Sequence, residues 1–184
     1  WAPAALAVTT SASGAEYTLT AQKDAAAQDL IYQHQSVNAA NAGAVAVEMG
    51  HAYSKLSFLA TAGNGYTGAA NLTQVQITGG IYATGTLNML DGKVDPVGTA
   101  TGTLTLAAGE KALVVPMAGQ PTIAVTCTID GKEFTATIKA DTMPSLLAGV
   151  EYEITLTVVG QEAVISSVKE VPWTTTKVDG GTIS

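Results

Sequence analysis

The sequence predicts an all-β protein folded as an antiparallel β-sandwich, and three observations support this prediction. Apolar and polar residues alternate with a period of two through most of residues 122–158, which is typical of strands with one buried face. Asp-Gly pairs at 91–92 and 130–131 stand between alternating runs and favour tight hairpin turns. Gly, Thr, Ala and Val dominate the composition, as in sheet proteins with many short strands.

The first part of the chain holds one expected strand and one short expected helix. Residues 16–21 alternate and predict the strand. Residues 24–35 predict the helix, because alanines favour helix, an aspartate can cap its first turn, and its apolar residues recur at helical spacing. Residues 1–15 are predicted to form a loop or a loose strand, and residues 36–42 a linker.

Two alternating runs follow each other in residues 43–62, separated by a glycine. In the first run Val45, Val47 and Met49 share one side, which predicts a half-buried strand. The second run begins at His51 and predicts another strand.

The rest of the chain is predicted to form short strands separated by turns. The glycine-rich residues 63–70 predict a turn. The expected strands cover residues 72–79, 81–90, 101–106, 111–116, 123–129, 133–139, 151–158 and 164–168. Val125, Phe134, Ile154 and Leu156 are expected to be buried together between two sheets, because each lies on the apolar side of its strand.

Composition and charge argue against several classes of partner. The chain has 184 residues and a net charge of −7, and all its basic residues are lysines. Binding of nucleic acid or of an anionic membrane surface depends on clustered Lys and Arg, so neither is expected. No apolar run approaches the ~20 residues that a membrane-spanning helix needs. A hydrophobic content of 47% is enough for a sizeable core.

No residue pattern indicates an enzyme, a cofactor site or a metal site. His34 and His51 lie in different segments and lack the spacing of metal ligands. Cys127 is expected to face the core and to behave as a small hydrophobe, with no basic neighbour to activate it. Neither a G-x-S-x-G nucleophile elbow nor a GxxxxGK[ST] phosphate loop occurs. We therefore expect no catalytic residue, no metal ion and no cofactor.

Five segments, taken in order, resemble one protein family. The segment HAYSKLSF at 51–58 resembles the F-x-HALSKL-x-F segment of the fimbrillin-type pilins and related surface lipoproteins of Bacteroidetes, although Met49-Gly50 replaces the family's phenylalanine. The other four segments that resemble the family are AAAQDLIYQHQSV at 25–37, the stretch from ALVVP to FTATI at 112–138, LLAGVEYEITLTV at 146–158 and VKEVPW at 168–173. The family position of His51 implies a structural role for this residue.

The resemblance implies a function as well as a fold. It implies transthyretin-like β-sandwich domains in a structural subunit of a cell-surface fimbria, which polymerises by β-strand donation and supports adhesion. It also implies other pilin subunits as partners and export through the outer membrane from a lipoprotein precursor. In the family, residues 1–42 would be the remnant or end of an N-terminal fimbrillin domain and residues 43–184 the C-terminal β-sandwich domain. The alternative is a surface-anchored adhesin that binds host protein or glycan without polymerising.

Three groups of residues are candidates for these roles. The candidates for a strand that contacts a neighbouring subunit are Val171, Trp173, Val178 and Ile183. The candidates for ligand contact are the aromatic residues Tyr66, Tyr82 and Trp173, for which packing is the favoured alternative. Thr142 is a candidate for O-glycosylation, because Asp141-Thr142-Met143 resembles the motif that Bacteroidetes glycosylate on exported proteins.

Overall fold

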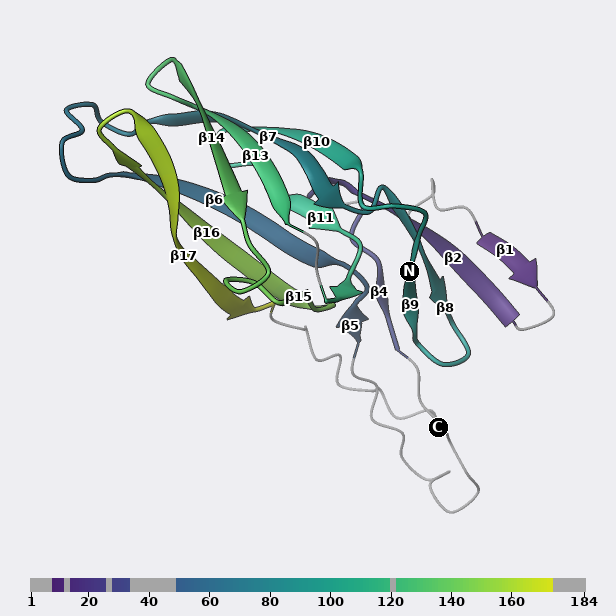
Figure 1. Ribbon diagram of the computed structural model, residues 1–184. Helices are drawn as coiled ribbons and strands as arrows, with labels where there is room; N and C mark the ends of the chain where they lie inside the picture. The colour runs from purple at the N-terminus through teal and green to yellow at the C-terminus, as the bar shows by residue number, and fades with distance from the viewer. Residues whose placement is uncertain (1–7, 12–13, 26–27, 34–48, 120–121, 174–184) are drawn as a thin grey trace.

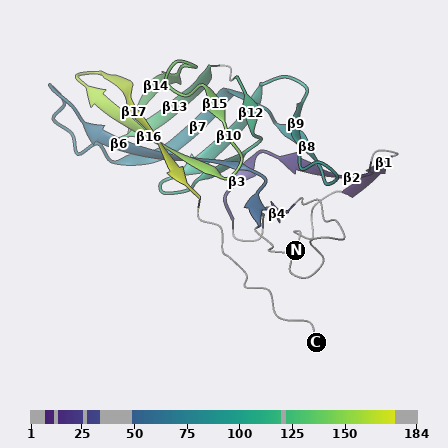
Figure 2. The ribbon, with the colours of Figure 1, turned by 90° about the horizontal axis from the view of Figure 1, so that it is seen from below.

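The computed structural model describes residues 8–11, 14–25, 28–33, 49–119 and 122–173, and every regular element in them is a strand (Figure 1). Two sheets face each other as a β-sandwich, and a smaller sheet lies beside it (Figures 1 and 2). The predicted all-β fold is thus confirmed. None of the described residues belongs to a helix of the length and apolarity that crossing a membrane requires.

The strands form three larger sheets and two short pairs. The first sheet has the order β17 (Glu162–Pro172), β16 (Val150–Val159), β6 (Ser54–Ala62), β11 (Ala112–Val114) and β3 (Gln22–Lys23). The second has the order β10 (Gly102–Ala107), β7 (Leu72–Ile81), β13 (Ile123–Ile129) and β14 (Lys132–Ile138). The third has the order β1 (Val8–Ser11), β2 (Gly14–Thr20), β8 (Thr84–Asn88) and β9 (Val94–Val97). The pairs are β12 (Met117–Ala118) with β15 (Ser145–Leu146), and β4 (Ile31–Tyr32) with β5 (Gly50–His51).

One strand pair departs from the antiparallel pattern. Strands β6 and β16 run parallel, with Lys55 opposite Glu151 and Ala62 opposite Val158. A parallel pair needs a long crossover, and here the chain builds the whole second sheet between the two strands. The long, continuous pairing of β6 with β16 fixes the position of β6 in the sandwich.

The main core lies between the two large sheets and follows the predicted alternation. Val125, Phe134, Ile154 and Leu156 are 1%, 7%, 0% and 0% exposed and belong to one cluster, which confirms their expected burial. Cys127 is in the same cluster and is fully buried, as expected of a small hydrophobic residue.

The Asp-Gly pairs form the predicted hairpin turns. Between β13 and β14, Asp130 and Gly131 have φ angles of 49° and 75°. Positive φ at both central residues is the signature of a type I′ turn, which matches the twist of the flanking strands. Gly92, between β8 and β9, also has a positive φ of 70°.

The prediction of a helix over residues 24–35 is wrong for the residues of this stretch that the structure describes. Residues 24–25 and 28–33 contain no helix, and Ile31 and Tyr32 form β4, which pairs with β5. Leu30 is 3% exposed, and its carbonyl accepts the amide of Ala52 at 2.8 Å. Leu30 belongs to a smaller hydrophobic core, which also contains Leu19, Ala52, Tyr53, Leu87, Leu113 and Val115. Its burial there outweighs the helix propensity of these residues, which is roughly a few tenths of a kcal/mol per residue. Residues 26–27 and 34–35 lie outside the described residues.

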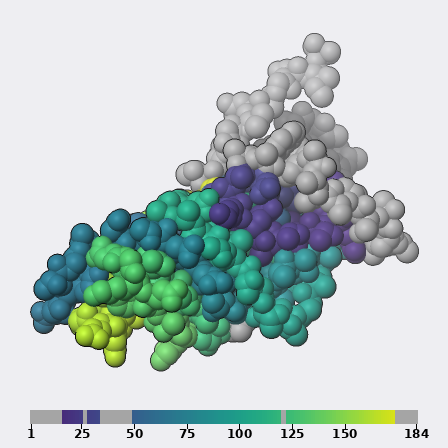
Figure 3. Space-filling view, turned by 90° about the horizontal axis from the view of Figure 1, so that it is seen from above, coloured from purple at the N-terminus to yellow at the C-terminus, as the bar shows by residue number. Residues whose placement is uncertain are grey.

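The N-terminal strands are paired with later parts of the chain. Strand β2 pairs with β8 and β3 pairs with β11, so the early residues lie against residues from the middle of the sequence (Figure 3). Val45, Val47 and the domain boundary expected after residue 42 lie outside the described residues, and Met49 belongs to no strand. The predicted division into two domains stays a prediction.

Candidate functional site

Strand β6 has one side that the described strands leave largely unpaired. It pairs with β16 from Lys55 to Ala62, but on its other side it pairs with β11 only at residues 54–56. In the described part of the chain, no strand pairs with residues 57–62 on that side. A row of unpaired backbone groups on a sheet edge is a template for another strand.

The direction of the free backbone groups follows from one hydrogen bond. The amide of Gly63 donates to the carbonyl of Val158 at 2.8 Å, so this residue is turned toward β16. The N–H and C=O groups of successive residues in a strand point to opposite sides. Phe58, Ala60 and Ala62 therefore direct their N–H and C=O groups to the side without a described partner.

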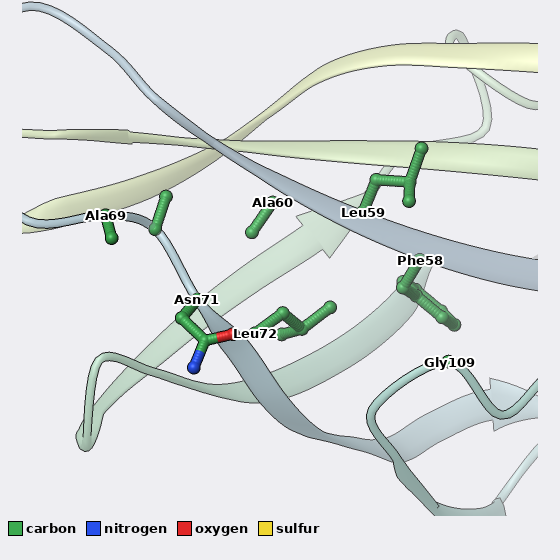
Figure 4. A pocket seen from close by; sticks show the side chains of 8 residues that line it. Phe58, Leu59, Ala60, Ala69, Asn71, Leu72 and Gly109 are labelled. Atoms are coloured by element: carbon green, nitrogen blue, oxygen red, sulfur yellow. The ribbon is translucent and has the colours of Figure 1, made fainter.

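A groove of about 550 Å³ runs beside this unpaired edge (Figure 4). Its lining comes from β6, from the end of the β6–β7 loop, from the start of β7 and from the turn after β10, namely Phe58, Leu59, Ala60, Ala69, Ala70, Asn71, Leu72 and Gly109. Phe58 and Leu72 extend into the space between the strands, whereas Leu59 lies on the opposite face of β6 (Figure 4). Most of these side chains are small or apolar, and polar and apolar atoms contribute about equally to the exposed lining, so the groove offers contacts to both the backbone and the side chains of an extended strand.

The rim of the groove is held by one carboxylate. Asp130 Oδ2 accepts the hydroxyl of Tyr66 at 2.7 Å and the amide of Ala70 at 2.9 Å, while Oδ1 accepts the amide of Asn71 at 3.0 Å. The hydrogen bond from Tyr66 is the main cause that holds the pKa of Asp130 below its usual range. Asp130 thereby ties the β13–β14 turn to the β6–β7 loop.

A group of aromatic and charged side chains surrounds Trp173 at the opposite end of β6. The His51 imidazole stacks on the Trp173 indole, and Lys55 Nζ lies 3.6 Å from the centre of a Trp173 ring. Lys55 also pairs with Asp24 at 2.7 Å, and His51 Nδ1 lies 2.6 Å from Asp29 Oδ2. Burial raises the pKa of Asp29 above its ordinary value, although the neighbouring His51 opposes this effect.

The cluster around Trp173 joins two of the segments on which the family resemblance rests. His51 and Lys55 belong to the HAYSKL segment, and Trp173 ends the VKEVPW segment. The amide of Trp173 also donates to the carbonyl of Gly149 at 3.2 Å. Two segments far apart in the sequence thus meet at one end of the sandwich, which agrees with the structural role predicted for His51.

The residues predicted to contact subunits or ligands do not form one site. Val171 pairs with Glu151 in the edge strand β17, and Val178 and Ile183 lie outside the described residues. Tyr66 binds Asp130, and Tyr82 packs against both hydrophobic clusters. The three candidate aromatics therefore contact different parts of the domain, and their predicted roles stay untested.

The predicted glycosylation site lies on the surface. Thr142 is exposed in a turn, where its amide donates to the carbonyl of Lys139 at 3.0 Å and its hydroxyl to Asp141 Oδ1 at 3.2 Å. Its accessibility is compatible with modification, which stays a prediction.

The described residues do not gather the side chains that a metal site would need. Among them, no three His, Cys, Asp or Glu side chains are placed to hold a metal ion. Burial raises the pKa of the Cys127 thiol to about 11, so very little of this thiol is ionised at neutral pH. We take the open edge of β6 and its groove as the candidate functional site.

Sequence reasoning missed both the groove and its rim. A pattern of alternation shows which face of a strand is buried, but it does not show which neighbour a strand lacks. The sequence predicts a turn for the glycine-rich residues 63–70 and a hairpin at Asp130, but it predicts no contact between them. The sequence offers one signal for this contact. A hairpin aspartate such as Asp130 has a carboxylate that can accept the backbone amides of a tight loop, here the loop before β7.

The comparison with known proteins agrees with the predicted family. Residues 2–173 match the family described as fimbrillin-like. No match was found among curated proteins.

Two solved structures share the fold. A protein of Bacteroides uniformis whose description names cell adhesion is 23% identical with a TM-score of 0.56, over 68% of this chain and 52% of that one. A Bacteroides ovatus protein, also described by cell adhesion, is 16% identical with a TM-score of 0.53, over 87% of this chain and 69% of that one. The chain spans about half the length of the Bacteroides uniformis protein. From the match that covers residues 2–173, the chain belongs to the fimbrillin-like family.

Proposed function

We propose that this chain is a structural subunit of a bacterial cell-surface fimbria that polymerises by β-strand donation and supports adhesion. The observation that carries the proposal is the open edge of β6, which lies beside a groove whose lining is partly apolar and partly polar. A strand of a second subunit would pair with the edge and place alternate side chains in the groove. This is β-augmentation, in which backbone hydrogen bonds give affinity and side-chain pockets give specificity.

The physical gain from such a strand is large. Phe58, Ala60 and Ala62 offer N–H and C=O groups to it, and each apolar side chain fully buried in the groove contributes about 1.5–3 kcal/mol. Phe58 lines the groove but is only 7% exposed, so it is packed into the core before a partner arrives and the gain comes from the side chains of the added strand. Several such contacts along one strand would give a durable polymer.

Other parts of this proposal rest on the family. Membership supports other pilin subunits as partners, a place at the cell surface and export from a lipoprotein precursor. The structures of similar fold are described by cell adhesion, which supports the adhesive role. A non-polymerising ligand-binding module is the weaker alternative, because the candidate aromatics contact separate parts of the domain.

Proline substitutions at neighbouring positions of β6 test the proposal. Ala60→Pro removes an N–H that faces the open side, which a strand tolerates at an edge. Leu59→Pro removes an N–H that faces β16 and should therefore damage the fold. We expect Ala60→Pro to keep the melting transition and to lose filaments in electron microscopy. Normal filaments from a folded Ala60→Pro chain would contradict the proposed use of this edge.

The origin of the donated strand is a separate question. Val171 and Trp173 are engaged within their own domain, so we propose that residues 174–184, with Val178 and Ile183, supply the contact to the next subunit. Removing residues 174–184 should leave the domain folded and abolish filaments. If filaments form without them, another segment is the donor.

A further inference from the structure

We propose that Asp130 is a positioning residue that shapes the groove beside β6 and so controls how well a strand of a second copy binds there. The inference rests on the proposed function, because it concerns the same groove. Asp130 itself does not line the groove. It acts through the β6–β7 loop, whose residues 69–71, together with Leu72 at the start of β7, form the wall opposite β6.

The loop is tied at both ends to the two sheets. At its beginning the amide of Gly63 is bonded to Val158 of β16. At its end three groups of the loop, the Tyr66 hydroxyl and the amides of Ala70 and Asn71, donate to the Asp130 carboxylate. The amide of Asp130 in turn donates to the carbonyl of Asn71 at 3.0 Å. The separation of the groove walls therefore depends on these bonds.

A strained residue lies in the wall that Asp130 holds. Ala70 has a φ of 56°, a left-handed conformation that non-glycine residues seldom adopt, and it is 6% exposed. Such strain persists where the surroundings impose it, and it concentrates at ligand-binding positions. Here the bond from the Ala70 amide to Asp130 imposes it. We infer that losing this bond lets the wall relax.

The space around the carboxylate is also closely filled. A Cβ atom added to Gly68 would lie 2.6 Å from the Tyr66 ring and hydroxyl, and it would overlap Asp130 Oδ2. The loop therefore accepts only glycine at position 68 while the Tyr66–Asp130 bond is made. Two loop positions, Gly68 and Ala70, thus depend on the same carboxylate.

The chemistry of asparagine makes Asp130→Asn a selective test. Asparagine favours the type I′ turn, so the hairpin is preserved. Its amide offers only one acceptor oxygen, whereas the Asp130 carboxylate uses both of its oxygens. Asp95→Asn is the matched control, because it makes the same change of charge at an exposed position of β9. Ala70→Gly accepts the positive φ without strain and provides a rescue variant.

The experiment combines amide exchange of the monomer with assembly of the full chain. We expect Asp130→Asn to speed exchange of the Ala70 and Asn71 amides and to slow filament assembly by about tenfold or more, the loss expected when charge-assisted bonds are removed. Asp95→Asn should change neither. Adding Ala70→Gly to Asp130→Asn should recover part of the assembly rate, because the wall no longer stores strain.

The outcomes distinguish failure of the role proposed for Asp130 from failure of the proposed function. Unchanged exchange at residues 70–71, or faster exchange with an unchanged assembly rate, would overturn the role of Asp130 while leaving the proposed function intact. If the wild-type chain itself does not assemble, the proposed function is wrong and this inference falls with it.

Discussion

The Trp173 indole stacks on the His51 imidazole, with ring centroids 3.8 Å apart and an angle of 9° between the planes. This contact joins the end of β17 to β5 and lies next to the ammonium group of Lys55. It places the end of the described chain at a fixed point of the domain.

Replacing Trp173 with alanine should destabilise the domain by about 2–4 kcal/mol, because it removes the stack, the cation–π contact and part of the smaller core. The free energy of unfolding in urea measures this loss. Trp173→Phe should lose less, since it keeps a ring beside His51. An unchanged urea midpoint for Trp173→Ala would show that the cluster contributes nothing to stability.

Phe134→Ala should cost about 3–5 kcal/mol, because it leaves a cavity in the main core between the sheets. Its neighbour Thr135 is exposed, so Thr135→Ala should have little effect. Thermal denaturation of both variants gives the comparison. Equal melting temperatures for the two variants would contradict the assignment of the inward face of β14.

Cys127 should resist alkylation while the chain is folded. The thiol is buried and its pKa is raised to about 11, so both access and thiolate are lacking at pH 7.5. Iodoacetamide labelling, followed by mass spectrometry, should modify the chain in urea but not in buffer. Rapid labelling of the folded chain would mean that β13 opens readily.

The stability that Asp130 provides should depend on pH in the acid range. Its folded-state pKa is lowered from 3.8, so the contribution is complete above 3.8 and is lost as the pH falls through the lower, folded-state value. The difference in unfolding free energy between wild type and Asp130→Asn should therefore shrink toward pH 2. Tyr66→Phe should move this loss to higher pH, because Tyr66 is the main cause of the lowered pKa. If the difference in unfolding free energy stays constant from pH 7 to 2, the ionised carboxylate of Asp130 does not stabilise the loop.

The sequence predicted the strands well because alternation reports directly on burial. Val125, Phe134, Ile154 and Leu156 lie together as expected. The helix over residues 24–35 failed because burial of Leu30 and the pairing of Ile31 with His51 depend on distant residues. The parallel pairing of β6 with β16 and the missing neighbour of β6 could not be predicted for the same reason. Both are properties of how strands are ordered, which local patterns do not contain.

Residue-level hydrogen exchange of β6, in the free chain and in filaments, tests the central claim most directly. The amides of Leu59 and Thr61 point toward β16, so they should be protected from exchange in both states. Phe58, Ala60 and Ala62 face the open side, so their amides should exchange quickly in the free chain and become protected in filaments. Amides of Phe58, Ala60 and Ala62 that exchange equally fast in both states would contradict strand donation at this edge.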